Sequence, residues 1–461
     1  MADPSPSLIV PNGGRAPLNS RVSNLFGPLL RGKYDSLAIA VSGGVDSMAL
    51  AWIAKAWQRE SGCHLTALTV DHGLRPGSDQ EARLVSAWMA DLGMSHHILR
   101  WNGERPMAGI QDAARQARYK LLTDWCRMNS ADALLVAHTL EDQAETFLMR
   151  LLRGSGGDGL AAMRAVSRIN GLPLIRPLLG VEKRELMGVL RDVGQDWIED
   201  PSNQDDQFAR VRVRRWSSTL SGLGLDADRL CKLAANFGAL RASLEDVTHH
   251  AVGDLVTFDP GGWAELPQGL LCRAPDVLAR RILLSVLRSV GGKYHAPRSD
   301  RVTRGLAKCR VTSAFQAFSL GGCIVRQKGH SLIIYREERG KAPPTELPSA
   351  DRFVWRGRFM CEFQGKMDKD KTPYSVGPLL DQGWRKAIVW DPTVRRLGIC
   401  HDCAATLPAL YDVDGLLEVP RLGLRRPDLL SGTPTEYPDR FRFKSVRFMK
   451  CFAPIELRKS L

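Results

Sequence analysis

One short segment of this chain combines glycine, serine and aspartate in an order that suits the binding of an anion. It reads Val41-Ser42-Gly43-Gly44-Val45-Asp46-Ser47, after an apolar run and before a helical pattern. A strand, a glycine turn and a helix in this order aim backbone N–H groups at one point, and the helix dipole favours phosphate there. The glycines allow close approach, Ser42 and Ser47 supply hydroxyl donors, and Asp46 could hold Mg²⁺. No Gly-Lys-Ser/Thr follows, so this is not a Walker A loop; a turn without a ligand is the alternative.

A second group of reactive side chains is His138, Asp142 and Glu145. Their spacing of i, i+4 and i+7 puts all three on one face if a helix runs through them. A histidine with two carboxylates could hold Mg²⁺, bind an ammonium group or exchange protons. The alternative is a polar helix N-terminus, where acidic residues are favourable because of the dipole. The phosphate-type loop favours the functional interpretation.

Residues 36–216 alternate between strand and helix patterns, and these elements must position both groups. We expect strands at 36–41, 65–70, 97–101 and 133–137. We expect helices at 47–60, from 78 (with Ser78 and Glu81 as a capping box), and at 110–129, 141–153 and 181–192. This alternation predicts an α/β domain with a doubly wound parallel sheet, in which ligands bind at the carboxyl ends of the strands.

Two more places in this domain could contact a nucleotide. Val70 ends the second strand beside the glycine turn, where an adenine ring needs backbone hydrogen bonds and an apolar slot. Arg115 and Arg118 share one face of the helix at 110–129 and could grip a phosphate, although a solvated basic face is the alternative.

Alternating arginines follow at Arg210, Arg212 and Arg214. They are typical of one face of an extended segment or of a scattered surface, and contact with phosphates or RNA backbone is the functional interpretation.

Composition limits the classes of protein that fit. A chain of 461 residues predicts two or three domains, and a net charge of +14 favours a polyanionic partner such as nucleic acid over a role in solubility alone. No apolar run approaches the length of a membrane span, and residues 1–20 lack a secretory signal pattern. We therefore expect a cytoplasmic protein without a membrane partner, with ten reduced cysteines and a disordered tail at 1–20.

Beyond residue 216 the pattern changes. We expect a linker at 217–225, a mainly helical domain at 226–340 that ends in a small sheet, a Pro-rich linker at 343–349, and a small α+β basic region at 352–461. Cys400 and Cys403 form a single C-x-x-C pair, for which we favour free thiols over zinc. Basic and aromatic residues alternate at 440–444, which fits RNA contact and a strand with one buried face equally well.

Taken in order, the motifs of residues 36–216 resemble the tRNA-isoleucine lysidine synthetase family within the PP-loop ATP-pyrophosphatase superfamily. The matching segments are S-G-G-V-D-S, V-D-H-G-L-R, Q-D-A-A-R-Q-A-R-Y, A-H-T-L-E-D-Q-A-E-T, L-L-R-G-S-G-G-D-G-L, R-P-L-L, E-D-P-S-N and R-V-R-V-R. Three positions depart from the family pattern: Thr139 replaces a second histidine, Glu141 an aspartate, and Val211 an asparagine.

The resemblance implies ATP-dependent ligation of free L-lysine onto the wobble cytidine of the CAU anticodon of tRNA(Ile), through an adenylated cytidine, with Mg²⁺. Residues 21–216 would be the catalytic domain, residues 226–340 would bind tRNA, and 352–461 would add tRNA contact. The oligomeric state is left open, with a homodimer as one option. The expected catalytic residues are Asp46, His138, Asp142 and Glu145, with Asp46 and Asp142 on the metal. The expected nucleotide contacts are Ser42, Gly43, Gly44, Val45, Asp46, Ser47, Val70, Arg118, Arg210 and Arg212.

Two alternatives remain. A tRNA thiolase on the same loop would need a reactive cysteine pair, and only Cys63 and Cys126 lie in the expected catalytic domain. A non-catalytic RNA-binding protein with a vestigial ATP site is the other.

Overall fold

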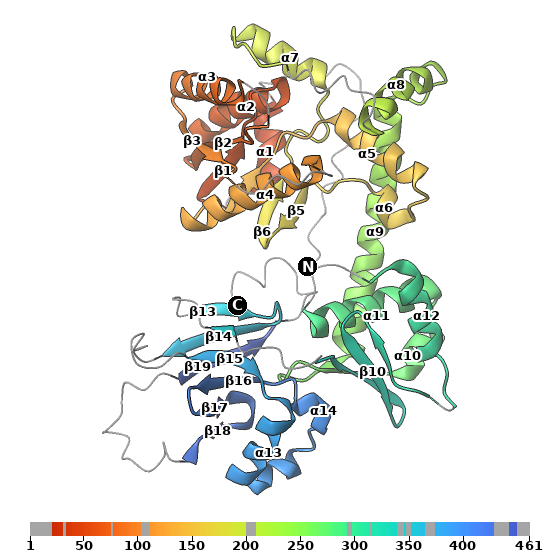
Figure 1. The fold of residues 1–461 in the computed structure, drawn as a ribbon. Helices are drawn as coiled ribbons and strands as arrows, with labels where there is room; N and C mark the ends of the chain where they lie inside the picture. The colour runs from red at the N-terminus through yellow and green to blue at the C-terminus, as the bar shows by residue number, and fades with distance from the viewer. Residues whose placement is uncertain are drawn as a thin grey trace. The chain divides into compact units, whose positions relative to one another are not determined.

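The structure, a computed structural model, describes residues 21–30, 34–74, 77–102, 110–199, 209–292, 297–313, 315–338, 345–346, 352–364, 374–427 and 442–449. The chain divides into two compact units, Met1–Ala242 and Ser243–Leu461, and the division falls inside one long helix, α9 (Ala227–Leu255) (Figure 1). The predicted tail at 1–20 lies outside the described residues.

The first unit is built on a six-stranded sheet with the order β3-β2-β1-β4-β6-β5. Its strands are β1 (Ser36–Ala40), β2 (His64–Asp71), β3 (Ser95–Arg100), β4 (Ala133–Leu135), β5 (Val166–Ile169) and β6 (Leu172–Ile175). All neighbours pair in parallel except β5 and β6, which form an antiparallel hairpin that we did not predict. The predicted α/β class is therefore confirmed.

Helices cover both faces of this sheet. The helices that carry its two apolar layers are α1 (Val22–Leu30), α2 (Val45–Ser61), α3 (Ser78–Asp91), α4 (Ile110–Met128) and α7 (Lys183–Asp192). Leu37 and Ile39 of β1 are fully buried in a cluster with α1, α2, α3 and α7. Ala38, between them, packs on the opposite face with Leu122 and Cys126 of α4. This alternation follows the two-residue period of a strand and explains why β1 is apolar at every position after Ser36.

A helical layer continues the first unit with α5 (Leu140–Leu152), α6 (Gly157–Leu160), α8 (Ala209–Gly222) and the start of α9. Val213 of α8 is buried with Phe147 of α5 and Leu230 of α9. The extended-segment alternative for the arginines is therefore wrong, and so is the predicted linker over residues 217–222, which continue α8. Val213 and Leu220 lie seven residues apart and both pack against this layer. The apolar residues of this segment therefore follow the period of a helix and not the two-residue period of a strand.

The second unit begins with α10 (Gln268–Arg273), α11 (Asp276–Gly291) and α12 (Ser299–Cys309), packed on an antiparallel sheet of order β7-β8-β11-β10-β9. Its strands are β7 (Thr257–Phe258), β8 (Ala264–Pro267), β9 (Phe318–Leu320), β10 (Cys323–Lys328) and β11 (Ser331–Arg336). The predicted hairpin is confirmed, with Gly329 in its turn at a φ of +59°.

Two further antiparallel sheets complete this unit. One has the order β12-β15-β16-β17-β18 and the other β13-β14-β19. The strands are β12 (Thr345–Glu346), β13 (Arg352–Trp355), β14 (Phe359–Gln364), β15 (Ser375–Pro378), β16 (Pro408–Asp412), β17 (Gly415–Val419), β18 (Leu424–Arg425) and β19 (Arg442–Phe448). Helical segments are α13 (Leu380–Trp390), η3 (Pro392–Leu397), α14 (His401–Ala404) and η4 (Pro420–Leu422).

Arg358 joins the three sheets of the second unit. Its side chain is fully buried, and its guanidinium donates to the backbone carbonyls of Gly262 (3.1 Å), Val290 (3.0 Å) and Thr406 (2.9 Å). Burial lowers the pKa of Arg358 to about 9. Residues of the middle and C-terminal parts of the chain thus share one interior, and the charge at its centre is held by carbonyl oxygens.

The described part of the basic and aromatic C-terminal segment favours the buried-strand interpretation. Phe443 is 7% exposed and stacks on Phe363, with ring centroids 4.7 Å apart, whereas Lys444 is exposed. Tyr437 and Phe441 lie outside the described residues.

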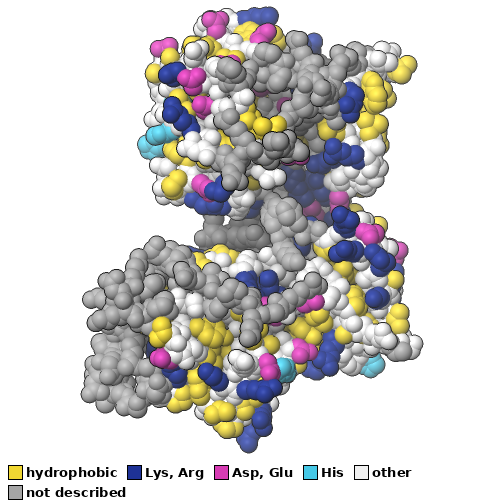
Figure 2. All heavy atoms as spheres, viewed as in Figure 1, with side chains coloured by type: hydrophobic (Ala, Val, Ile, Leu, Met, Phe, Trp, Pro, Cys, Tyr) yellow, Lys and Arg dark blue, Asp and Glu magenta, His cyan; other side chains and the backbone are white. Residues whose placement is uncertain are grey.

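Surface charge and helix length bear on possible partners. Figure 2 shows Lys and Arg side chains on the visible surface of both units, interspersed with Asp and Glu. None of the helices in the described ranges is both long and apolar enough to cross a membrane.

Candidate active site

The glycine turn places the N-terminus of α2 at the carboxyl edge of the sheet. Gly44 is the N-cap residue of α2 and, as a glycine, supplies no capping side chain. Gly43 has a φ of +86°, and a Cβ at this position would lie 2.6 Å from Ile198 Cδ1 and 2.8 Å from Val85 Cγ2. Both the backbone conformation and the close packing therefore require glycine at 43. Among the described residues, a Cβ on Gly44 would meet nothing closer than 3.9 Å, which leaves room beside the start of α2 for the anion that a helix N-terminus favours.

Serine hydroxyls brace this turn from within. Ser47 Oγ donates to the carbonyl of Gly44 (2.9 Å) and accepts from the backbone N–H of Ser42 (3.1 Å). Ser42 Oγ lies 3.2 Å from Ser47 Oγ, and since the Ser47 hydrogen goes to Gly44, Ser42 is the donor in this pair. The hydroxyl of Ser47 thus shapes the turn, and its predicted contact with phosphate stays a prediction.

A buried hydrogen-bonded pair supports the strand end below the turn. Thr69 Oγ1 donates to the carbonyl of Val41 (2.8 Å) and lies 2.8 Å from His96 Nε2. Because the threonine hydroxyl has one hydrogen, His96 Nε2 must be the donor to Thr69. Burial, with a smaller effect of His97, lowers the pKa of His96 to about 4, so the ring is neutral near pH 7. The sequence carried no signal for this support.

Thr139 starts α5 and corrects the expected geometry of the acidic group. It is the N-cap residue, and it forms a capping box in which its backbone N–H donates to Asp142 Oδ2 (3.0 Å). His138 therefore precedes the helix, and the prediction of a helix that carries three residues on one face holds only for Asp142 and Glu145. Threonine is a better N-cap residue than histidine. The replacement of the family's second histidine by Thr139 therefore has a structural reason.

Arg214 pairs with Glu145. Glu145 is 4% exposed, and Arg214 Nε lies 2.5 Å from its Oε1. A carboxylate this buried needs such a partner. Of the arginines that we assigned to the nucleotide, Arg212 is exposed, and the side chain of Arg210 lies outside the described residues.

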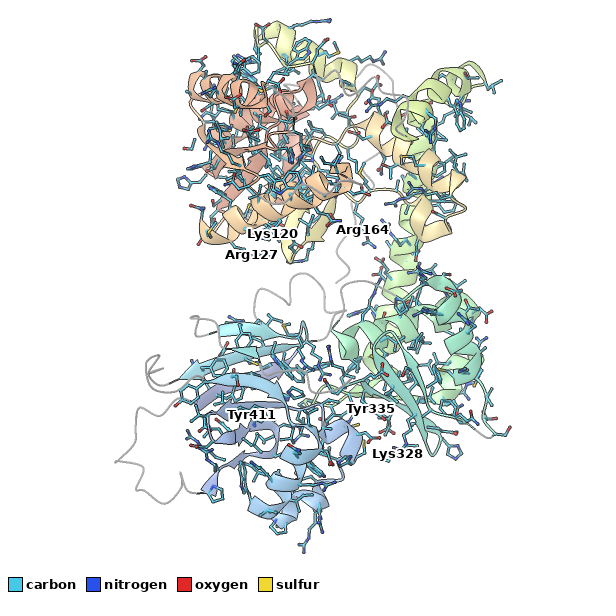
Figure 3. The ribbon with its side chains drawn as sticks, in the orientation of Figure 1. Lys120, Arg127, Arg164, Lys328, Tyr335 and Tyr411 are labelled. Carbon is cyan, nitrogen blue, oxygen red and sulfur yellow. The ribbon has the colours of Figure 1, made fainter. Side chains whose placement is uncertain are left out.

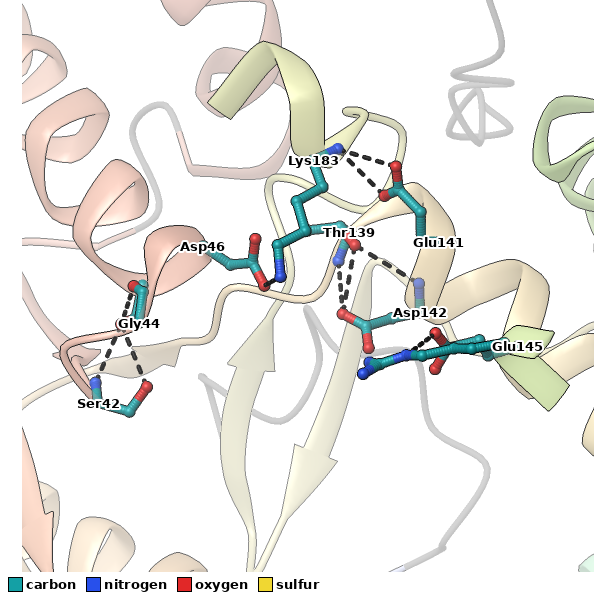
Figure 4. A network of polar contacts seen from close by, with 10 residues as sticks. Ser42, Gly44, Asp46, Thr139, Glu141, Asp142, Glu145 and Lys183 are labelled. Carbon is teal, nitrogen blue, oxygen red and sulfur yellow. Dashed lines mark hydrogen bonds and ion pairs between the residues drawn. The ribbon is translucent and has the colours of Figure 1, made fainter. Parts of the chain in front are cut away.

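Lys183 reaches the glycine turn from α7. Its backbone N–H donates to both carboxylate oxygens of Glu141 (3.0 and 3.1 Å), and its Nζ lies 3.8 Å from Asp46 Oδ2 (Figure 4). Glu141 thereby caps α7 and fixes the lysine opposite the first turn of α2. Sequence reasoning missed this lysine because the contact joins segments that are far apart in the chain.

The environment of Asp46 fits a cation. Burial raises the pKa of Asp46 to about 6, opposed by Lys183, with Asp142 and Glu141 adding to the rise. Its buried Oδ1 has no hydrogen-bond partner among the described residues. Within those residues no three His, Cys, Asp or Glu side chains gather closely enough to hold a metal by themselves. Mg²⁺ keeps waters and phosphate oxygens, so one or two carboxylates suffice, and the donor set fits Mg²⁺ bound with a nucleotide.

The end of β2 brings together two of the predicted nucleotide contacts. Val70 is half-buried, and Arg118 Nε donates to Nε2 of His72 (3.1 Å), two residues further on. Burial, with Arg118 adding to the effect, lowers the pKa of His72 to about 4. Ser78 does not cap α3 as predicted: Gly77 is the N-cap residue, and Ser78 Oγ donates to Asp71 Oδ1 (2.8 Å).

In this sheet, β1 turns through two glycines into α2, and carboxylates follow the neighbouring parallel strand β4. This arrangement defines a PP-loop domain. The sequence profile of the PP-loop domain family matches residues 16–217. The chain is 36% identical to the tRNA(Ile)-lysidine synthase of Ruegeria pomeroyi over 84% of this chain and 89% of that protein. It is 43% identical to that of Rhodopseudomonas palustris over 65% of this chain and 90% of that protein. The chain belongs to the tRNA(Ile)-lysidine synthase family.

Among solved structures, the U34-tRNA thiolase NcsA from Methanococcus maripaludis matches with a TM-score of 0.43 and 16% identity, over 48% of this chain and 77% of that one.

Proposed function

We propose that this chain ligates free lysine to the wobble cytidine of the CAU anticodon of tRNA(Ile) at the expense of ATP, forming lysidine. Cytidine O2 attacks the α-phosphorus of ATP and releases pyrophosphate; the ε-amine of lysine then displaces AMP. The observation that carries this proposal is the N-terminus of α2, where Gly44 offers no capping side chain and Asp46 lies in the first turn, close enough to Asp142 and Glu141 of α5 to feel their charge.

In the first step, negative charge develops on the departing pyrophosphate. The backbone N–H groups at the start of α2 are aimed at that charge, and Mg²⁺ held by Asp46 with Asp142 would offset it further. We assign Arg118 of α4, whose guanidinium reaches His72 just after β2, to the nucleotide, and we assign Arg210 and Arg212 the same task. Val70 would contact the adenine through its backbone.

In the second step, the lysine ammonium must be held and must lose a proton before it can attack. Asp142 and Glu145 lie one turn apart on α5 and supply negative charge for an ammonium group. His138, half-buried just before α5, is our candidate for moving the proton. Arg214 holds one oxygen of Glu145, so we assign lysine contact first to Asp142.

The thiolase alternative finds little support in the first unit. Cys63 and Cys126 are buried, and burial raises the pKa of Cys63 to about 11 and of Cys126 to about 12. Thiols with such pKa values are poor nucleophiles near pH 7. The vestigial-site alternative requires a damaged site, whereas Asp46, Asp142 and Glu145 are all present.

The experiment that tests the function uses the purified full chain with ATP, Mg²⁺, labelled lysine and a tRNA(Ile) transcript that carries CAU. We expect label in the tRNA and one pyrophosphate per lysine incorporated, and neither with the methionine tRNA of the same anticodon. Absence of label, together with pyrophosphate release that does not depend on tRNA, would refute the proposal. We place the activity in the cytoplasm, and size measurement of the active species would decide between a monomer and a homodimer.

A further inference from the structure

The Cys400-x-x-Cys403 pair lies in the second unit and has no part in the nucleotide site. Cys400 directly precedes α14, and Cys403 lies on that helix. The backbone N–H of Cys403 donates to Cys400 Sγ (3.3 Å), which holds the first sulfur over the turn that carries the second. Cys400 is partly exposed and Cys403 is 1% exposed. One thiol can therefore meet a small molecule while the other stays protected behind it.

The two thiols have opposite acidities. A hydrogen bond from the Cys403 side chain, only partly offset by burial, lowers the pKa of Cys400 to about 6. The same interaction, together with burial, raises the pKa of Cys403. In contrast, burial raises the pKa of the described cysteines Cys63, Cys126, Cys231, Cys309 and Cys361. Near pH 7 the pair thus holds one thiolate and one thiol.

Neighbouring side chains fix the turn between the cysteines. Asp402 accepts from Arg326 Nη1 (3.0 Å) and from the hydroxyl of Tyr335 on β11 (3.0 Å; Tyr335 is labelled in Figure 3). His401 Nε2 lies 2.7 Å from Asp381 Oδ1. Cys403 itself packs against Ile333 and Tyr335. Both residues between the cysteines are anchored, so the turn that holds Cys400 Sγ 3.3 Å from the backbone nitrogen of Cys403 is fixed on both sides.

We propose that Cys400 and Cys403 form a redox-active dithiol that closes to a disulfide by exchange with small-molecule disulfides. The Cys400 thiolate attacks one sulfur of the small disulfide, forms a mixed disulfide and expels the first thiolate. Cys403 gives up its proton to solvent and attacks Cys400 Sγ, and the second thiolate leaves. The protein gains one disulfide, and the small molecule is reduced to two thiols.

The two thiols must play different parts in this series of reaction steps. Cys400 is the attacking sulfur because it is accessible and ionised, and Cys403 resolves the mixed disulfide because it is adjacent and shielded. The disulfide would lie where α14 packs against β11, within the second unit. The proposal is independent of the ligase reaction, so either one can fail without the other.

The test uses the full chain with glutathione disulfide, rapid alkylation and mass spectrometry. Wild type and the Cys272→Ser control, which removes an exposed thiol, should each form an internal Cys400–Cys403 disulfide without bound glutathione at the pair. Cys403→Ala should instead keep one glutathione on Cys400, and Cys400→Ser should take up none at Cys403. At pH 6, iodoacetamide should modify Cys400 in the wild type roughly tenfold faster than the cysteine of an unstructured peptide.

Two results would overturn the proposal. The first is a wild-type pair that stays fully reduced while Cys272 becomes glutathionylated. The second is zinc that survives dialysis and leaves only when both thiols are modified, because the pair would then be a metal ligand. The wild-type measurements alone decide the question if a variant fails to fold.

Discussion

Asp46 serves two opposed demands. The proposed function needs a charged carboxylate at the start of α2, yet burial raises the pKa of Asp46 to about 6, so the folded protein disfavours that charge. The unfolded chain ionises this group near its ordinary pKa of 3.8, which means that the folded state loses stability as pH rises from about 4 to about 6.

We expect Asp46→Asn to be more stable than wild type and inactive. Above pH 6 the free energy of unfolding should rise by about 1–3 kcal/mol, because the asparagine carries no disfavoured charge. The difference should vanish below about pH 4, and denaturant unfolding across this range measures it. Asp192→Asn on the exposed end of α7 is the control and should change stability by less than about 0.5 kcal/mol. A loss of stability in Asp46→Asn at pH 7.5 would contradict the expectation.

We expect Lys183 to change partners when a nucleotide binds. Its side chain is 47% exposed and only 3.8 Å from Asp46, so Nζ is able to turn toward the outer phosphates once Mg²⁺ occupies the carboxylate. We expect Lys183→Ala to weaken binding of a non-hydrolysable ATP analogue about tenfold, equal to about 1.4 kcal/mol, and to leave AMP binding unchanged. Titration calorimetry reports both affinities.

The matched control for this change is Lys120→Ala, because Lys120 is an exposed lysine of α4 paired with Asp124 (Figure 3). It should bind both nucleotides as wild type does. Equal losses for AMP and the ATP analogue in Lys183→Ala would point to general damage instead of a lost phosphate contact.

At the scale of elements, the start of α5 depends on one hydroxyl. The Thr139 hydroxyl accepts from the backbone N–H of Asp142 (3.5 Å) and donates to Asp142 Oδ2 (3.4 Å), so it caps the helix and also contacts the acidic side chain. Thr139→Ala should therefore lower the free energy of unfolding by about 0.5–2 kcal/mol and reduce turnover, whereas Thr139→Ser should keep most of both. Denaturant unfolding and the lysine-incorporation assay check this, and an alanine variant indistinguishable from wild type would show that the cap is unimportant.

The elements that the sequence predicted best are those with one clear period. Apolar runs such as 36–41 and 65–70 predicted the central strands, and the glycines at 43 and 44 predicted the turn between β1 and α2. Helix α8 was missed because alternating arginine and valine mimic a strand, and only packing of Val213 against α5 reveals the helix. His138 was misplaced because a boundary shift of a few residues decides whether it is helical.

The site was harder to predict than the fold because its contacts join distant segments. Lys183 meets Asp46, Arg214 meets Glu145, and His96 supports the turn through Thr69. None of these pairs follows from spacing along the chain, since each depends on which strand ends and helix starts become neighbours.

At the scale of the whole molecule, the second unit depends on one buried cation. Arg358→Leu would leave the carbonyls of Gly262, Val290 and Thr406 buried without their donor. We expect a loss of about 3–5 kcal/mol, confined to the unfolding of residues 243–461. Calorimetry with limited proteolysis would locate the change, and Arg395→Leu, at an exposed arginine, is the control. A variant that melts like wild type would show that the three sheets hold together without this side chain.

The packing at Gly43 limits the mutations that its codon can tolerate. Every missense change of one base in a glycine codon introduces a side chain with a Cβ, and here that atom would collide with Ile198 and Val85 in a backbone conformation that side chains avoid. We therefore expect codon 43 to have no neutral missense neighbour. In a saturation library selected for function, this codon should retain only synonymous variants. Codon 44, where a Cβ meets no atom of the described residues closer than 3.9 Å, should retain small residues at low frequency.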